Sequence, residues 1–583
     1  MNIKKFCFTV LFLPLFFLHA QNPLRSVDLT SQKPSWQAVI GGQAIAPVAE
    51  TSYGFAVVSD GRLVCTCTSG GKVMWQRDTK ARPTGKIQAW GDFLYYITNN
   101  SELNLMNPSG SVVWKTDTKF KITQKPVTGR DGRVFVQGKN NVACYGYGGR
   151  LKWNLELAAC DDIILQTFPD GSLLVFFNQA YQGKSTGLRI SPFGKELETI
   201  TFAGTIVTAS QCGQGVLMTF TDGSAGLCTV QNGTAVSKWV VKDSRSSAPF
   251  KSIIPGKETS ALIKNDSGGT RVLIIRNDSG KEENYFLISR IELDTVQSTK
   301  ATENGFFICD KKNAEEFTAD GTINWQAKLP PEKTWSYITY TNTNQILICM
   351  NNWVLNAFLM SQSVQSVKSV SKTKIESKSY VKASKMNRRI DGVTYTTTPQ
   401  ERMDEILLAF TKGGYGEKEE LMLSQLKEQT ENYISELSQN SSFSHNRSTF
   451  YSSNPIYTQT VFKAVEQSQS DIFASDLADL LLLESDTLML NTLILTAQKL
   501  AYDREGRILS ALETIANQNN TAKDTKKAVL ICDATYSIVK FMGRPALYRQ
   551  GKNILSHFLY PQYDKAIRDY AAQTLKNIIK LEL

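Results

Sequence analysis

The chain has 583 residues, more than one ordinary hydrophobic core accommodates, and a formal net charge of +11. Two of these charges, Lys4 and Lys5, lie in a predicted leader, and residues 361–400 hold eight Lys or Arg against two acids, so only +3 remains for the rest of the chain. The excess positive charge is therefore confined to short segments, which argues against a nucleic-acid-binding protein.

Residues 1–20 are predicted to be a secretory signal peptide. Lys4 and Lys5 precede an apolar run from Phe6 to Leu18, and Ala20 stands where a signal peptidase would cut. The run is shorter than the roughly 20 residues of a membrane-spanning helix, although a retained anchor remains the alternative. Cys7 lies inside the apolar run, so we expect no lipid attachment there. The mature chain is predicted to be periplasmic or otherwise extracytoplasmic.

A tryptophan repeat covers the predicted propeller region, residues 21–360. Trp36, Trp75, Trp114 and Trp153 are spaced 39 residues apart, and the runs that end in the last three each begin with a turn glycine, as in Gly71-Lys-Val-Met-Trp75. Later copies of the same pattern are degenerate. The predicted repeat anchors are Trp36, Trp75, Trp114, Trp153, Leu197, Trp239, Leu287 and Trp325.

Each period also contains two further turn signals, separated by short runs of β-branched and aromatic residues such as Phe93–Ile97. Four strands in about 40 residues is typical of a propeller blade. We therefore expect an eight-bladed β-propeller, closed by Ser26–Thr30 as the outer strand of the blade that begins after Trp325. A β-sandwich or an open meander is the alternative, but neither requires equal periods.

The turn glycine, short run and Trp resemble the PQQ-like, or tryptophan-docking, repeats of two families. One is the quinoprotein alcohol and glucose dehydrogenases, and the other is the propeller lipoprotein of the bacterial outer-membrane barrel assembly machinery. The resemblance covers residues 26 to about 360. The first likeness implies a quinone and calcium in the central channel, and the second implies protein binding without chemistry.

Catalytic residues are not predicted by any motif in the propeller region. It has no histidine, no adjacent cysteine pair and no Cys-x-x-Cys-His sequence. We therefore expect no catalytic, cofactor-binding or metal-binding residues and no cofactor. The cysteines of the mature chain are interpreted mostly as small buried hydrophobes, although an exported protein could pair some of them as disulfides. They are Cys65, Cys67, Cys144, Cys160, Cys212, Cys228, Cys309, Cys349 and Cys532.

Residues 361–400 are predicted to be a basic, Ser/Lys-rich linker, either simply solvated or contacting a membrane surface or an anionic polymer. Ser369-Val-Ser-Lys372 matches a Ser-x-x-Lys motif, which we attribute to composition. Residues 401–583 are predicted to form an α-helical domain, either HEAT-like repeats or a bundle. Ile567, Ala571, Leu575 and Ile578 there follow helical spacing.

Together these features favour an exported, non-catalytic scaffold of the bacterial cell envelope. Blade loops and helices would each offer a surface to envelope protein partners, and nucleic acid is not expected as a partner. The alternative is a quinoprotein-like or other ligand-binding enzyme that acts in the propeller channel, using Asp, Glu, Asn and backbone groups. A stable protein partner would support the scaffold, and a bound quinone or calcium would support the enzyme.

Overall fold

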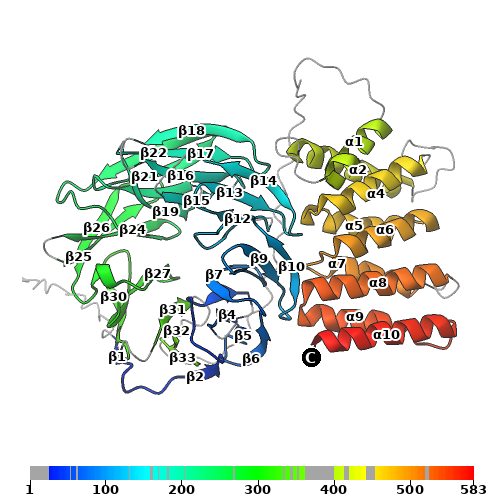
Figure 1. Cartoon of the computed structure of the whole chain (residues 1–583), viewed down its shortest axis with the longest axis horizontal. Coiled ribbons are helices and arrows are strands. Elements are labelled where there is room, and N and C mark those ends of the chain that lie inside the picture. Colours follow the sequence, from blue (N-terminus) through cyan, green and yellow to red (C-terminus); the bar gives the residue numbers. More distant parts are fainter. Residues whose placement is uncertain are drawn as a thin grey trace, which may run out of the picture.

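The computed structural model describes residues 25–360, 399–440 and 454–582, apart from gaps at 53, 61–62, 130–131, 158–161, 169, 180–182, 203, 214, 267–268, 332–334, 342–345, 351–352, 413–418 and 519–523. The predicted signal peptide and residues 361–398 of the predicted linker lie outside the described residues. Within them the chain forms a β-propeller with a stack of helices at its side (Figure 1).

The strands of the propeller form eight separate hydrogen-bonded sheets in the part of the chain that the structure describes. The first four are β3 (Ala49–Thr51), β4 (Gly54–Val58), β5 (Leu63–Thr68) and β6 (Val73–Asp78); β7 (Pro83–Trp90), β8 (Phe93–Thr98), β9 (Glu102–Met106) and β10 (Val112–Asp117); β11 (Val127–Thr128), β12 (Val134–Gln137), β13 (Asn141–Tyr145) and β14 (Leu151–Glu156); and β15 (Asp162–Thr167), β16 (Leu173–Gln179), β17 (Lys184–Ile190) and β18 (Glu196–Phe202).

The next two sheets are β19 (Ile206–Cys212), β20 (Gly215–Phe220), β21 (Ser224–Gln231) and β22 (Thr234–Lys242); and β23 (Ser252–Pro255), β24 (Thr259–Asp266), β25 (Gly269–Arg276) and β26 (Glu282–Ile288). The last two are β27 (Ser298–Ala301), β28 (Phe306–Cys309), β29 (Asn313–Phe317) and β30 (Ile323–Lys328), joined by β1 (Arg25–Asp28); and β31 (Tyr337–Thr341), β32 (Ile346–Met350) and β33 (Val354–Leu359), joined by β2 (Trp36–Val39). The first strands of successive sheets pack against one another, which places them innermost.

The predicted fold class, eight like blades closed by Ser26–Thr30, needs correction at the closure. Strand β2, which begins at Trp36, pairs antiparallel with β33 and completes the blade that begins after Trp325. The segment upstream instead forms β1, which pairs in parallel with β30 as a fifth strand. The physical reason is that each anchor tryptophan lies on the fourth strand of its blade, counted from the innermost strand. Trp36 therefore already fills the outer position, and no place remains there for Ser26–Thr30.

An apolar cluster packs the sheet of β3–β6, the first along the chain, against the sheet of β31–β33 and β2, the last. Phe55 and Val57 of β4 pack in one buried cluster with Ile348 of β32 and Leu355 of β33. Similar clusters lie between other neighbouring sheets, as expected when the two faces of every blade are covered by its neighbours.

The helices form two rows beside the propeller. One row contains α1 (Pro399–Lys412), α4 (Pro455–Ser468), α6 (Thr487–Leu500), α8 (Thr525–Met542) and α10 (Lys565–Glu582); the other contains α2 (Glu419–Asn440), α5 (Ala474–Leu483), α7 (Arg507–Ala516) and α9 (Pro545–His557). Two short 3₁₀ turns, Leu293–Thr295 and Asp471–Phe473, complete the described helical segments. Consecutive helices alternate between the rows, so each pair is a helical hairpin.

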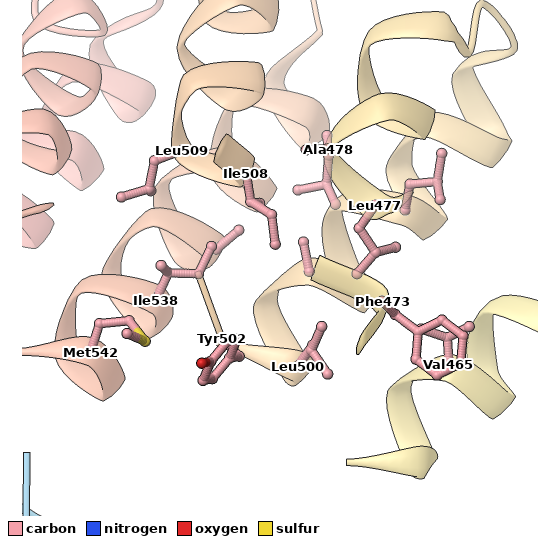
Figure 2. Packing of buried hydrophobic residues seen from close by; sticks show 14 of the residues in the cluster. Val465, Phe473, Leu477, Ala478, Leu500, Tyr502, Ile508, Leu509, Ile538 and Met542 are labelled. Carbon is pink, nitrogen blue, oxygen red and sulfur yellow. The ribbon is translucent and has the colours of Figure 1, made fainter. Parts of the chain in front are cut away.

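Apolar side chains fill the space between the rows. Figure 2 shows Leu477 and Ala478 of one hairpin on the side toward Ile508 of the next, with Phe473 beside Val465. Helices α4, α6 and α8 are each preceded by an Asn or Asp whose side chain accepts a hydrogen bond from the backbone N–H of the third helical residue. These caps satisfy donors that the first helical turn leaves unpaired.

Candidate functional site

In the described part of the chain, the most extensive set of polar and apolar contacts between distant segments lies where the propeller meets the helices. We call this interface the seam. On the propeller side it is made by turns of the second and third sheets, β7–β10 and β11–β14. On the helical side it is made by the end of α1, the start of α2 and the turns that follow α4, α6 and α8 (Figure 1). The site is therefore one edge of the helical stack set against two blades.

Three helices of one row end at the seam in the same unusual backbone conformation. Gln469 after α4 has φ 48°, Ala501 after α6 has φ 53°, and Gly543 after α8 has φ 59°, all left-handed. A left-handed residue ends a helix and turns the chain sharply, which brings the next helix back antiparallel. It also leaves the last carbonyl groups, the negative end of the helix dipole, pointing toward the propeller.

The propeller supplies hydrogen-bond donors to these carbonyl groups. Nδ2 of Asn107, in the β9–β10 turn, donates to the carbonyl oxygens of Lys540 at 2.8 Å and Phe541 at 3.2 Å. Nη1 of Arg150, in the β13–β14 turn, donates to the carbonyl oxygen of Phe410 near the end of α1 at 3.0 Å. Positive or donating groups thus face the negative ends of α8 and α1.

Asn107 also builds the turn from which it reaches the helices. Its Oδ1 accepts hydrogen bonds from the backbone N–H of Ser109 at 3.1 Å and of Ser111 at 3.0 Å. One amide side chain therefore uses its oxygen to fix the turn and its nitrogen to bind the helical domain.

Two ion pairs cross the seam. Nζ of Lys152 on β14 lies 2.7 Å from Oε1 of Glu419 at the start of α2, and the two side chains are only 7% and 1% exposed. Nε of Arg544, just after α8, lies 2.8 Å from Oδ2 of Asp92 in the β7–β8 turn. A buried pair adds little net stability, but removing one partner leaves an uncompensated charge. The Lys152–Glu419 pair therefore enforces one register between the two parts.

Aromatic rings join the two hydrophobic cores across the seam. Tyr147 of the β13–β14 turn lies 5.5 Å from Tyr502 and 6.2 Å from Phe541, measured between ring centroids. Phe541 also lies 5.9 Å from Phe93 of β8. Burial, with the nearby carboxylate of Asp471, raises the pKa of the Tyr147 and Tyr502 hydroxyls, so both stay neutral. One buried cluster consequently runs from the propeller into the helices.

A small polar cavity of about 20 Å³ lies within the seam. Arg133, Lys152, Glu419 and Gln469 line it, and Oε2 of Glu419 and Oε1 of Gln469 have no hydrogen-bond partner among the described residues. The volume suits about one water molecule, which could satisfy both oxygens. The cavity is too small for a substrate and belongs to the seam.

The predicted anchor tryptophans link each blade to the next. Nε1 of Trp75 donates to the carbonyl oxygen of Pro108 at 2.6 Å, and Trp114, Trp153 and Trp239 make the same contact with Tyr147, Pro192 and Asn277. Trp36 lies against Gly71, and Trp325 is buried beside Tyr340. Trp114 thereby supports the Tyr147 turn, which carries the aromatic part of the seam.

Leu197 and Leu287 occupy a different position from the tryptophans. Both side chains are exposed, and the strand register places Glu198 and Asn284 where the other sheets have their indole rings. Oε1 of Glu198 lies 2.6 Å from Nη1 of Arg189 and accepts a hydrogen bond from the backbone N–H of Ala235 in the next blade at 2.7 Å. A charged pair thus replaces the tryptophan contact in this blade.

Candidate chemistry elsewhere is sparse in the described residues. No group of three or more His, Cys, Asp or Glu there could hold a metal ion. His557 on α9 packs among the rings of Phe558, Tyr560 and Tyr563, while His445 and the Ser369 motif lie outside the described residues. Within the propeller, Lys300 of β27 pairs with Glu50 of β3, although the sheet of β31 lies between their sheets. Among the described helices, none is long and apolar enough to cross a membrane.

The residues of the seam were not predicted from the sequence. Asn107, Lys152, Glu419 and Arg544 belong to no motif that we identified as functional in the sequence. Their partners lie hundreds of residues away, as with Lys152 and Glu419, which are 267 residues apart. No local pattern marks such a pair, because each side chain is unremarkable within its own element.

Comparison with known proteins finds similarity at the level of the propeller. No protein-family model matches the chain, and no curated protein matches it. Among solved structures, BamB from Moraxella catarrhalis is 13% identical, covering 56% of this chain and 98% of its own, with a TM-score of 0.42. Sqt1 from Saccharomyces cerevisiae is 12% identical, covering 57% and 100%, also with a TM-score of 0.42. Sqt1 from Chaetomium thermophilum, bound to the N-terminus of the ribosomal protein L10, is 10% identical, covering 56% and 100%, with a TM-score of 0.44. Likenesses this low carry no argument about function.

Proposed function

We propose that this chain is an exported, non-catalytic interaction scaffold of the bacterial cell envelope, built on a propeller of PQQ-like repeats, which binds partner proteins. The observation that carries the proposal is the seam. A continuous buried core, two ion pairs and hydrogen bonds to helix ends join the propeller and the helices, and all of these contacts are structural. Such a joint holds two binding surfaces at a fixed separation and orientation.

The edge of the helical stack away from the propeller supports the proposal. Helices α4 and α6 begin there and α5 ends there, and large apolar side chains at these positions are exposed: Ile456 at 71% and Leu488 at 55%, at the starts of α4 and α6, and Leu482 at 54% near the end of α5. Exposed apolar groups gathered near one edge are typical of protein-binding surfaces. The seam uses the opposite edge, so this one stays available.

A photocrosslinking experiment in cells tests the proposal. A photoreactive amino acid is placed at Ile456 or Leu488, and at Leu493 as a control, because Leu493 lies on α6 but is fully buried. We expect one envelope protein to be captured from both exposed positions and not from Leu493, with mass spectrometry identifying it.

The enzyme alternative predicts a different result from the same preparation. If the exposed positions capture no common protein, and the purified chain carries a quinone absorbance or tightly held calcium, the scaffold proposal is wrong. The propeller channel would then be the site to study.

A further inference from the structure

The sheet of β27–β30 is the one described sheet with an additional strand on its outer edge. Strand β1 lies parallel to β30, with Arg25 opposite Trp325 and Asp28 opposite Lys328. The other seven sheets of the described chain have four strands each, and no fifth strand pairs with the outer one. An unpaired outer edge offers backbone N–H and C=O groups to any extended segment, so β1 shows that this edge accepts one.

The contacts of β1 are those of a bound peptide. The backbone ladder continues one residue beyond the strand, because the N–H of Leu29 donates to the carbonyl oxygen of Lys328 at 3.0 Å. Leu29 is 2% exposed and packs in a cluster with Trp325, whereas Ser26 and Asp28 face solvent. Val27 is partly buried against the same cluster, so recognition rests on the backbone, the buried anchor Leu29 and the apolar side chain of Val27.

Strand β1 is not needed to close the propeller ring. Closure is made by β2, whose register with β33 runs from Trp36 opposite Ala357 to Val39 opposite Val354. The connection between β1 and β2 is short, and five of its six residues from Thr30 to Ser35 are exposed. Removing β1 would therefore leave the four-stranded sheet and the closure intact.

We propose that the outer edge of β30 is a binding site for an extended peptide segment of a partner protein with an apolar residue at the position of Leu29, and that β1 occupies this site as an intramolecular competitor. This proposal names a class of partner for the scaffold function proposed above, and it rests on that function. A short tether holds its segment at an effective concentration in the millimolar range, so β1 excludes weaker segments until it is released.

Peptide binding to a shortened chain tests the proposal. The probe is a fluorescent peptide with the sequence of residues 24–30, and the two proteins are the mature chain from residue 21 and a chain that begins at Ser31. By fluorescence anisotropy we expect saturable binding to the shortened chain, at least 10-fold tighter than to the mature chain. A peptide carrying Leu29→Asp should lose this binding, because its anchor no longer fits the apolar cluster.

A second variant guards against misfolding of the shortened chain. Leu29→Asp in the mature chain should release β1 without truncation and open the edge to the unmodified peptide. The proposal is overturned if both variants fold, by melting temperature and circular dichroism, yet neither binds the peptide. It is also overturned if the shortened chain pairs with itself as a dimer instead, or if neither variant folds, since β1 would then be an integral strand. None of these results depends on whether an envelope partner is found by crosslinking.

Discussion

Gly110 and Gly233 occupy the same position in two blades, but we expect their substitution to change the free energy of unfolding by different amounts. Both lie in the turn before an outermost strand, with φ of 79° and 83°. A Cβ at Gly110 would lie 2.6 Å from the indole of Trp75, whereas a Cβ at Gly233 would meet nothing within 4 Å, because Glu198 replaces the indole there. The glycine requirement is thus partly conformational and partly steric.

Alanine substitution should separate the two contributions. We expect Gly233→Ala to lower the free energy of unfolding by about 1–2 kcal/mol, the ordinary cost of a left-handed alanine. Gly110→Ala should cost about 1–3 kcal/mol more, because the indole must move. Urea unfolding followed by tryptophan fluorescence measures both. Equal losses would contradict the steric role of Trp75.

The buried cysteines are predicted to be unreactive in the folded protein. Burial raises the pKa of Cys65 and Cys228 to about 11, and that of Cys67 and Cys532 to about 12. A thiol is nucleophilic only when ionised, so a pKa raised from 9.0 to about 11 lowers the thiolate fraction near pH 8 by about 100-fold, in addition to the steric effect of burial.

Thiol labelling over a pH series tests this expectation. In the native protein these four cysteines should stay unlabelled between pH 7 and pH 9, since a thiol with a pKa of about 11 is only about 1% ionised at pH 9. The same protein in concentrated guanidinium is the control and should label rapidly. Rapid native labelling that rises through pH 8–9 would show that the thiols are accessible and have ordinary pKa values.

At the scale of elements, the repeated helix ends determine how the helical stack meets the propeller. Gly543 suits the left-handed conformation, but the equivalent residue after α6 is Ala501, whose Cβ disfavours it. We expect Ala501→Gly to raise the free energy of unfolding by about 0.5–1 kcal/mol. Ala572→Gly in the middle of α10 is the control and should lower it by about 1 kcal/mol. Thermal unfolding of both variants measures the difference, and a loss at Ala501 would contradict a strained cap.

Much of this element-level structure could be predicted from the sequence. The 39-residue spacing and the turn glycines indicated the propeller, and the helical spacing of Ile567 and Ala571 indicated helices at the end of the chain. Two details failed. The sequence of Ser26–Thr30 indicates an outer strand, and we therefore expected this segment to close the ring. The residues of a strand do not specify which other strand it pairs with, so the pairing with β30 could not be predicted.

The candidate site was less predictable, for a related reason. Leu197 was predicted as an anchor because it is the apolar residue that ends this copy of the repeat, whereas the register places Glu198, paired with Arg189, at the position of the tryptophans. Similarly, Lys152 and Glu419 become informative only when the fold brings them together. Periodicity reports which face of an element is buried, but not which distant element covers it.

At the scale of the whole molecule, the seam should make the propeller and the helices unfold together. Phe541 contacts both Phe93 and Tyr147 of the propeller, so Phe541→Asp places a charge inside the shared core. In calorimetry we expect one transition for the unmodified chain and two for the variant. The earlier transition should lie about 5–15 °C lower, as a loss of a few kcal/mol implies for a domain of this size.

Tyr560→Asp is the matched control for this experiment. Tyr560 is an aromatic residue of the same helical domain but is 57% exposed, at the edge away from the propeller. Its substitution should leave a single transition near the original temperature. Two transitions in the unmodified chain would mean that the seam does not couple the two parts.

The closure by β2 also dictates an order of assembly. Gln37 of β2 hydrogen-bonds Asn356 of β33, a residue 319 positions later. A chain synthesised or exported from its N-terminus must therefore keep its first closing strand unpaired until nearly the whole propeller has emerged. Contacts of such long sequence separation form slowly, and an exposed strand edge invites wrong pairing meanwhile. The ring is consequently most vulnerable to aggregation just before it closes, when seven sheets can be complete and the eighth still lacks its outer strand.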